Sequence, residues 1–140
     1  MSDLDLIPNE ELVQWLNRQN GWFVAGSSAV PGCASNDRDV VVLVDAYADA
    51  RDTHPRFLTE FSGSEYTALQ PNICLRAPGI DLIVTDRYDT FILWHKATLI
   101  CKKLRLTSRA DRLVVHHTLL ERAGEYTDPP FMYKFPLCLI

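Results

Sequence analysis

The chain places one aspartate inside an apolar segment and two more at the start of another, and this pattern restricts its fold most. Asp81 lies in the run Ile80-Asp81-Leu82-Ile83-Val84, and Asp37 and Asp39 open a run that continues to Val44. Both runs are short, apolar and rich in β-branched residues, as buried strands are. A charge within a buried strand is costly unless it is paired or holds a metal ion. We therefore expect these strands to meet around a polar site.

Composition limits the class of protein that can surround this site. The 140 residues suffice for one domain with a hydrophobic core, and the 47% hydrophobic content is ordinary for a soluble globular protein. The net charge of −4 gives no global basic field, so nucleic acid would have to bind a local patch. The four cysteines lack metal-ligand spacing, and the N-terminal residues do not resemble a signal peptide. No apolar run could span a membrane, so we expect a cytoplasmic protein with reduced thiols.

The first half of the chain is predicted to form a helix followed by strands. Asn9 can cap a helix that begins at Glu10 and buries Leu12, Trp15 and Leu16 on one face. Residues 28–36 are expected to form a turn or a very short helix, and residues 55–61 a helix capped by residue 53. Strands are predicted at 22–25, from 37 or 39 to 44, at 72–76 and at 80–84. The last two strands form a hairpin with the three-residue loop 77–79.

The second half of the chain has helical spacing. We expect one helix over 89–104 and another over 113–122, the latter following a weak capping box at 108–111 and ending at Gly124. The chain is thus expected to be one domain over 1–140, with a core at 22–84, a helical part at 89–123 and a tail at 124–140. This order of elements corresponds to an α+β fold with a small mixed β-sheet, flanking helices and a helical C-terminal half. The expected core contacts of the first of these helices are Phe91, Trp94, Leu99 and Cys101 or Leu104.

Carboxylates and a Gly-Ser pair define the candidate site. Because strand side chains alternate, Asp37 and Asp39 should point to one face of the sheet and Arg38 to the other. Together with Asp81 from a neighbouring strand, these carboxylates can bind Mg²⁺, which prefers oxygen ligands and retains water and substrate phosphates. Two such ions can hold the attacking and leaving oxygens of a phosphoryl transfer. At Gly26-Ser27 the glycine lets the backbone approach a triphosphate closely.

These residues, taken together, resemble the nucleotidyltransferase superfamily of the DNA polymerase beta type. The matching pattern is Gly26-Ser27, nine residues, Asp37-Arg38-Asp39-Val40 and then an apolar strand that contains Asp81. The resemblance covers about residues 22–84. Residues 89–122 are similar, more loosely, to the helical half of short nucleotidyltransferase-like proteins that are common in tailed-bacteriophage genomes.

The resemblance implies a role for each of these residues. Asp37, Asp39 and Asp81 would be catalytic and would bind magnesium, with Asp81 also helping to deprotonate the acceptor hydroxyl. Gly26 and Ser27 would hold the phosphates of a nucleoside triphosphate. The implied reaction transfers a nucleoside monophosphate to a hydroxyl on a small molecule, an RNA end or a protein.

Arg38 departs from the family pattern, which usually has an apolar residue between the two aspartates. An arginine at the mouth of a strand can reach solvent, pair with a carboxylate or bind a phosphate. Arg38 and the small size of the chain leave open a second hypothesis. In this alternative the protein has the same fold but little or no catalytic activity, and it binds a host protein or a toxin. For a phage-encoded protein, that partner would be met in the host cytoplasm.

Basic and histidine residues in the second half allow further interpretations. Lys102, Lys103, Arg105, Arg109 and Arg112 form either a patch for a triphosphate or acceptor, or a solvated helix end. We favour the solvated helix end for Lys102 and Arg109, whereas Arg112 and Lys96 would face the site if their helices pack across it. His116 and His117 are adjacent, so one should point inward and the other outward.

Overall fold

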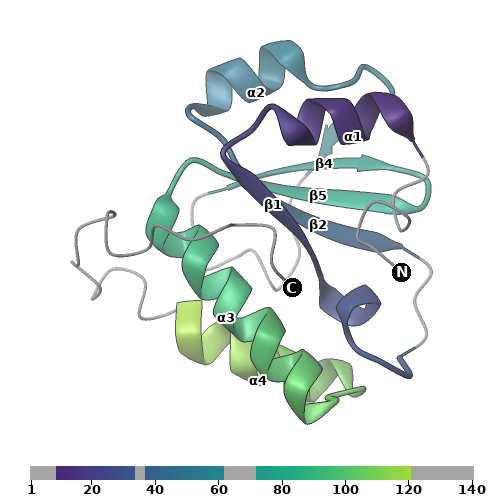
Figure 1. Cartoon of the computed structure of the whole chain (residues 1–140), viewed down its shortest axis with the longest axis vertical. Helices are drawn as coiled ribbons and strands as arrows, with labels where there is room; N and C mark the ends of the chain where they lie inside the picture. The colour runs from purple at the N-terminus through teal and green to yellow at the C-terminus, as the bar shows by residue number, and fades with distance from the viewer. Residues whose placement is uncertain (1–8, 34–36, 62–71, 121–140) are drawn as a thin grey trace.

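The computed structural model describes residues 9–33, 37–61 and 72–120, which form an α+β fold around a five-stranded mixed sheet. Helices α1 (Glu10–Asn17) and α2 (Tyr47–Thr53) cover one face of this sheet (Figure 1). Helix α3 (Tyr88–Leu104) covers the other face, and α4 (Arg109–Leu120) packs against α3. The predicted class, α+β with flanking helices and a helical C-terminal half, is confirmed for these residues. The predicted tail at 124–140 and the predicted stop at Gly124 lie outside the described residues.

The sheet has the strand order β1-β2-β5-β4-β3. Strand β2 pairs with β5 in parallel, and the other three pairings are antiparallel, so the predicted mixed sheet is confirmed. The parallel pair brings Asp39 next to Asp81 although the two residues are far apart in the sequence. The bounds of the strands are β1 Gly21–Ala25, β2 Arg38–Leu43, β3 Thr59–Phe61, β4 Ile73–Ala77 and β5 Ile80–Thr85.

Helix α1 forms as the sequence predicts. The Asn9 side chain accepts a hydrogen bond of 3.0 Å from the backbone N–H of Leu12, which satisfies one of the free donors at the helix start. Leu12, Trp15 and Leu16 are all buried against the sheet. The apolar spacing and the cap therefore act together to fix the position of this helix.

The predicted helix over residues 55–61 is wrong. Thr53 ends helix α2 instead of capping a later helix, and its hydroxyl donates to the carbonyl of Asp49 at 2.7 Å. The same hydroxyl accepts a 3.0 Å hydrogen bond from Nε1 of Trp15. Residues Thr59–Phe61 form the short edge strand β3, because their backbone pairs with β4. A contact that is distant in the sequence thus decides the structure of this segment.

The β4–β5 hairpin is confirmed, but its loop is shorter than predicted. Ala77 pairs with Ile80, so the loop consists of Pro78 and Gly79 alone. Gly79 has a φ of +83°, which a Pro-Gly turn requires at its second position. The register of the whole hairpin follows from this two-residue loop.

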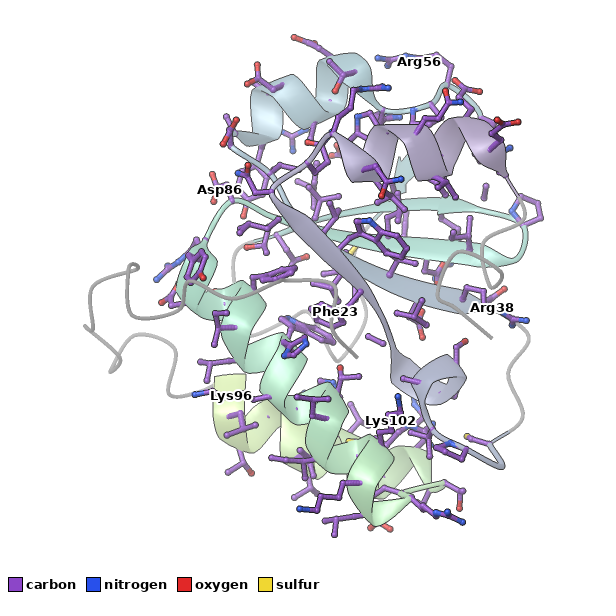
Figure 2. The ribbon with its side chains drawn as sticks, viewed as in Figure 1. Phe23, Arg38, Arg56, Asp86, Lys96 and Lys102 are labelled. Atoms are coloured by element: carbon purple, nitrogen blue, oxygen red, sulfur yellow. The ribbon has the colours of Figure 1, made fainter. Side chains whose placement is uncertain are left out.

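Two core clusters lie on the two faces of the sheet, and they assign a face to each strand residue. Val40 and Val42 pack with the α1 side, whereas Val41 and Leu43 pack with the α3 side. On the α3 side, Phe23, which is labelled in Figure 2, makes an edge contact with Phe91 at 5.1 Å between ring centroids. By strand alternation, Asp39 therefore faces α3 and the preceding residue faces α1.

The helical half agrees with the sequence in part. Helix α3 has the predicted extent, and Phe91, Trp94 and Cys101 are buried in it. Leu99 is 39% exposed, so its predicted core position is wrong. Of the predicted alternatives Cys101 and Leu104, Cys101 lies in the core and Leu104 is 61% exposed. Helix α4 begins at residue 109 rather than at 113. As expected for adjacent helical residues, His116 is buried and its neighbour His117 is only half buried.

No helix among the described residues has both the length and the apolar character needed to cross a membrane.

Candidate functional site

One residue from each strand lies in a row across the sheet, and this row contains two of the predicted site residues. Register pairing gives the order Ala25, Asp39, Asp81, Arg76 and Thr59. Neighbouring strands are about 4.8 Å apart, so consecutive side chains in such a row are adjacent. The alternation of core residues places the row on the face that α3 covers. The structure therefore brings together Asp39 and Asp81, as the sequence predicts.

The turn after β1 packs directly against the Asp39 carboxylate. Gly26 has a φ of +62°, a backbone conformation that glycine adopts readily. A Cβ added at Gly26 would overlap Oδ2 of Asp39 and lie 3.1 Å from its carboxyl carbon. Both observations require glycine at this position. Gly26 and Ser27 open a short 3₁₀ helix, Gly26–Ala29, whose first residue lies against Asp39, and phosphate binding at this turn stays a prediction.

The Asp39 carboxyl group has a strongly altered acidity. Its pKa is raised from 3.8 to about 7, mainly by burial and then by the neighbouring carboxylates of Asp81 and Asp37. The charges of Arg109 and Arg76 act in the opposite direction. A buried carboxyl beside two others binds a cation more favourably than an isolated one, because the cation relieves both the burial cost and the repulsion.

Asp81 is held by an ion pair that the sequence analysis missed. Nε of Arg76 lies 2.6 Å from Oδ1 of Asp81, and a terminal guanidinium nitrogen lies 3.3 Å from Oδ2. The Arg76 guanidinium also stacks over Phe61, with 3.9 Å between its carbon and the ring centroid. The hairpin register places Arg76 opposite Asp81, so a correct two-residue loop in the prediction would have revealed the pair.

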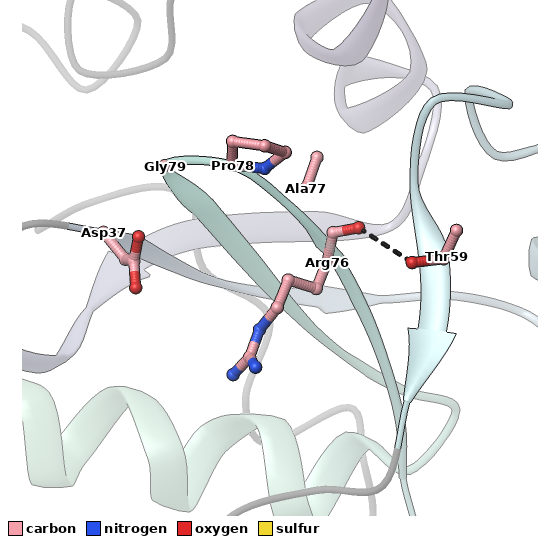
Figure 3. Close-up of a pocket in the computed structure, with 6 residues that line it drawn as sticks. All are labelled: Asp37, Thr59, Arg76, Ala77, Pro78 and Gly79. Carbon is pink, nitrogen blue, oxygen red and sulfur yellow. Dashed lines mark hydrogen bonds between the residues drawn. The ribbon is translucent and has the colours of Figure 1, made fainter.

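Asp37 lies at the edge of the site rather than in the row. It is exposed and precedes β2, and its backbone carbonyl accepts a 2.9 Å hydrogen bond from the Ser28 hydroxyl. Its carboxylate lines an open pocket of about 400 Å³, which Figure 3 shows with Arg76 between Asp37 and Thr59. The pocket therefore adjoins the row at its β3 end. Its lining residues are Asp37, Thr59, Arg76, Ala77, Pro78 and Gly79.

Arg38 lies on the opposite face of the sheet from Asp39. Its backbone N–H donates to the carbonyl of Gly79 at 2.9 Å, and its side chain is half buried at the start of β2 (Figure 2). The Arg38 Nε is buried and has no hydrogen-bond partner among the described residues. This arrangement explains how an arginine is accepted between two aspartates, because its charge does not lie among the carboxylates. Its contact with a phosphate stays a prediction.

Two arginines of the predicted basic stretch, Arg112 and Arg109, have roles that differ from the prediction. Arg112 is buried, and one of its terminal nitrogens donates to the carbonyls of Leu106 and Thr107 at 3.1 and 2.8 Å. This arginine therefore fastens the α3–α4 loop. Arg109 is exposed at the start of α4, yet its charge is close enough to lower the pKa of Asp39. Arg109 therefore acts electrostatically on the site.

The donor set fits magnesium through two carboxylates rather than three. Within the described ranges, no three His, Cys, Asp or Glu side chains are gathered to hold one ion together. Magnesium is usually bound by one or two carboxylates, with water and substrate phosphates completing its shell. Asp39 and Asp81 supply two such carboxylates beside the Gly26 turn, and the Arg76 guanidinium is a positive charge already placed at Asp81. The two carboxylates therefore match the number that magnesium commonly uses, while the Arg76 guanidinium engages both oxygens of Asp81.

Comparisons with known proteins do not assign the chain to a family. No protein-family model, curated protein or solved structure matches it. The class that the described residues define is an α+β domain with a five-stranded mixed sheet and a carboxylate pair on the face below α3. Function has to be inferred from that carboxylate pair and the turn beside it.

Proposed function

We propose that the protein is a magnesium-dependent nucleotidyltransferase with a fold of the DNA polymerase beta type. It would transfer a nucleoside monophosphate from a nucleoside triphosphate to a hydroxyl on a small molecule, an RNA end or a protein. The observation that carries this proposal is the contact of the Gly26 backbone with Asp39, which in turn lies beside Asp81. A phosphate-binding turn and two carboxylates on neighbouring strands are the parts that such a reaction needs.

Each residue of the site has a role in the proposed reaction. Asp39 and Asp81 would bind the metal ion, and Asp37 would bind at the outer side, where two ions could be held. Gly26 and Ser27 would donate backbone and hydroxyl hydrogen bonds to the triphosphate. Bound magnesium would neutralise the charge that develops on the phosphates. The acceptor oxygen would form a bond to the α-phosphorus while the bond to pyrophosphate breaks, and the acceptor proton would leave toward Asp81.

Thermal unfolding in the presence of magnesium and nucleoside triphosphates tests the binding part of this proposal. We expect the unfolding temperature to rise with a mixture of the four nucleoside triphosphates and millimolar magnesium, because ligands that bind the folded state stabilise it. Asp39→Asn should remove this rise. Asp52→Asn, at an exposed position on α2, should retain it. A wild-type protein that shows no rise with any nucleotide would refute nucleotide binding.

Transfer itself is tested with α-labelled nucleoside triphosphates. The protein is incubated with each labelled nucleotide and a bacterial lysate, and labelled products are separated by size and charge. We expect a labelled product with wild type and none with Asp39→Asn. This experiment would also identify the class of the acceptor.

The Arg76–Asp81 ion pair favours a second candidate function. A guanidinium already engages both oxygens of Asp81, as it would in a site that no longer binds metal. The protein would then be an inactive member of the same fold class that binds a host protein or a toxin in the cytoplasm. This alternative predicts that a folded variant with Asn at 37, 39 and 81 keeps its biological activity. Loss of activity in that variant would exclude it.

A further inference from the structure

The Arg76 guanidinium occupies both oxygens of Asp81. The two contacts, 2.6 Å to Oδ1 and 3.3 Å to Oδ2, form the bidentate arrangement that arginine and carboxylate prefer. A metal ion that binds Asp81 needs at least one of these oxygens. Arg76 and a divalent cation therefore compete for the same atoms.

Arg76 is placed so that it can give up this contact at low cost. Its side chain is 52% exposed, whereas that of Asp81 is 18% exposed, so the guanidinium can move into solvent and the carboxylate cannot. The open pocket between Asp37 and Thr59 offers space for the displaced guanidinium (Figure 3).

The charges of the cluster also favour such an exchange. Asp37, Asp39 and Asp81 carry three acidic groups, and Arg76 interacts electrostatically with all three. Without a positive charge at this position, the repulsion among the carboxylates would act on the folded protein. A divalent cation would replace the neutralisation that Arg76 supplies.

We propose that Arg76 is a resident counter-cation that holds Asp81 until a divalent cation displaces it. This inference rests on the proposed function, because it concerns the same carboxylates. Arg76 sets how tightly the site binds metal. When released, it carries its charge into the pocket beside Asp37, where an anionic group of a substrate could meet it.

Direct measurement of metal affinity tests this role. Mn²⁺ binding without nucleotide is measured by calorimetry for wild type, Arg76→Met and Arg51→Met. Arg51 is the control, because its side chain is as exposed as that of Arg76 and forms an ion pair with Glu60, which lies on the other face of the sheet. We expect Arg76→Met to bind Mn²⁺ about tenfold more tightly than wild type, as loss of a bidentate competitor allows. Arg51→Met should equal wild type.

The outcomes separate failure of this inference from failure of the proposed function. Wild-type binding that Asp39→Asn abolishes, together with equal or weaker binding by Arg76→Met, would overturn the role of Arg76 alone. Absence of Mn²⁺ binding in both wild type and Arg76→Met would overturn both. NMR of the Arg76 Nε–H in the wild-type protein provides a second readout that requires no variant. Its resonance should shift as diamagnetic Mg²⁺ is added, and an unchanged resonance at saturating Mg²⁺ would contradict displacement.

Discussion

Replacing Asp39 with asparagine should stabilise the protein at neutral and alkaline pH, although it removes the residue that is central to the proposed function. The folded protein holds the Asp39 carboxyl in a partly buried position beside two other acidic groups. Asparagine has nearly the same shape and carries no charge. Catalytic groups are often held at a cost to stability, so a gain on their removal is expected.

The size of this effect follows from the two states of the Asp39 carboxyl group. Its pKa is about 7 in the folded protein, against an ordinary value of 3.8. Below 3.8 it is protonated in both states, so it does not affect stability there. As the pH rises toward 7, the unfolded chain ionises first, and the folded state loses stability relative to it. At about 1.4 kcal/mol per unit of pKa difference, the largest possible loss in the free energy of unfolding is about 4 kcal/mol. Because the carboxyl is only partly buried, we expect about 2–3 kcal/mol.

Urea unfolding at two pH values measures this difference. Tryptophan fluorescence follows unfolding of wild type, Asp39→Asn and the exposed control Asp52→Asn, with EDTA present to remove divalent cations. Asp39→Asn should be more stable than wild type at pH 8, and the difference in their free energies of unfolding should nearly vanish at pH 4. Added Mg²⁺ should reduce this difference at pH 8. A difference that is independent of pH, or an asparagine variant less stable than wild type at pH 8, would refute the reasoning.

Two further substitutions test other parts of the structure. Gly26→Ala should destabilise the protein by at least about 2 kcal/mol, because the left-handed backbone of Gly26 and the overlap with Asp39 both oppose a side chain. The cost should be smaller in an Asp39→Ala background. Equal costs of Gly26→Ala in the two backgrounds, measured by a urea double-mutant cycle, would contradict the contact between Gly26 and Asp39. Burial lowers the pKa of His116, so below pH 6.5 the unfolded chain takes up a proton more readily and stability should fall. The loss between pH 7.5 and 5.5, measured by urea unfolding, should be smaller in His116→Phe than in wild type; an equal loss would show that His116 is not responsible.

The parts of the fold that local patterns determine could be predicted from the sequence. Helix α1 formed as expected because Asn9 and the apolar spacing at Leu12, Trp15 and Leu16 act within a few residues of one another. Strands β2 and β5 were recognisable because their short runs are apolar and rich in β-branched residues. The sequence also predicted that Asp81 comes from a strand neighbouring that of Asp39, whereas the parallel register that sets the two residues side by side is given by the structure.

The errors arose where distant contacts decide the structure. Thr53 can cap a helix or end one, and its bond to Trp15 on another helix decides between them. The exposed residues of β3 carry no alternation, so only pairing with β4 makes them a strand. The three-residue loop of the prediction would have placed Arg76 opposite Ile80. The actual two-residue loop places it opposite Asp81 and creates the ion pair at the centre of the site.

Paramagnetic broadening by Mn²⁺ in the presence of nucleoside triphosphate tests the central claim most directly. Mn²⁺ accepts the same oxygen ligands as Mg²⁺ and broadens amide resonances near its binding site. The amides of Gly26, Asp39 and Asp81 should broaden at the lowest Mn²⁺ concentrations, well before that of Leu12 on the opposite side of the sheet. Broadening that begins elsewhere, or none at these three amides at millimolar Mn²⁺, would contradict a metal and nucleotide site at the carboxylate pair.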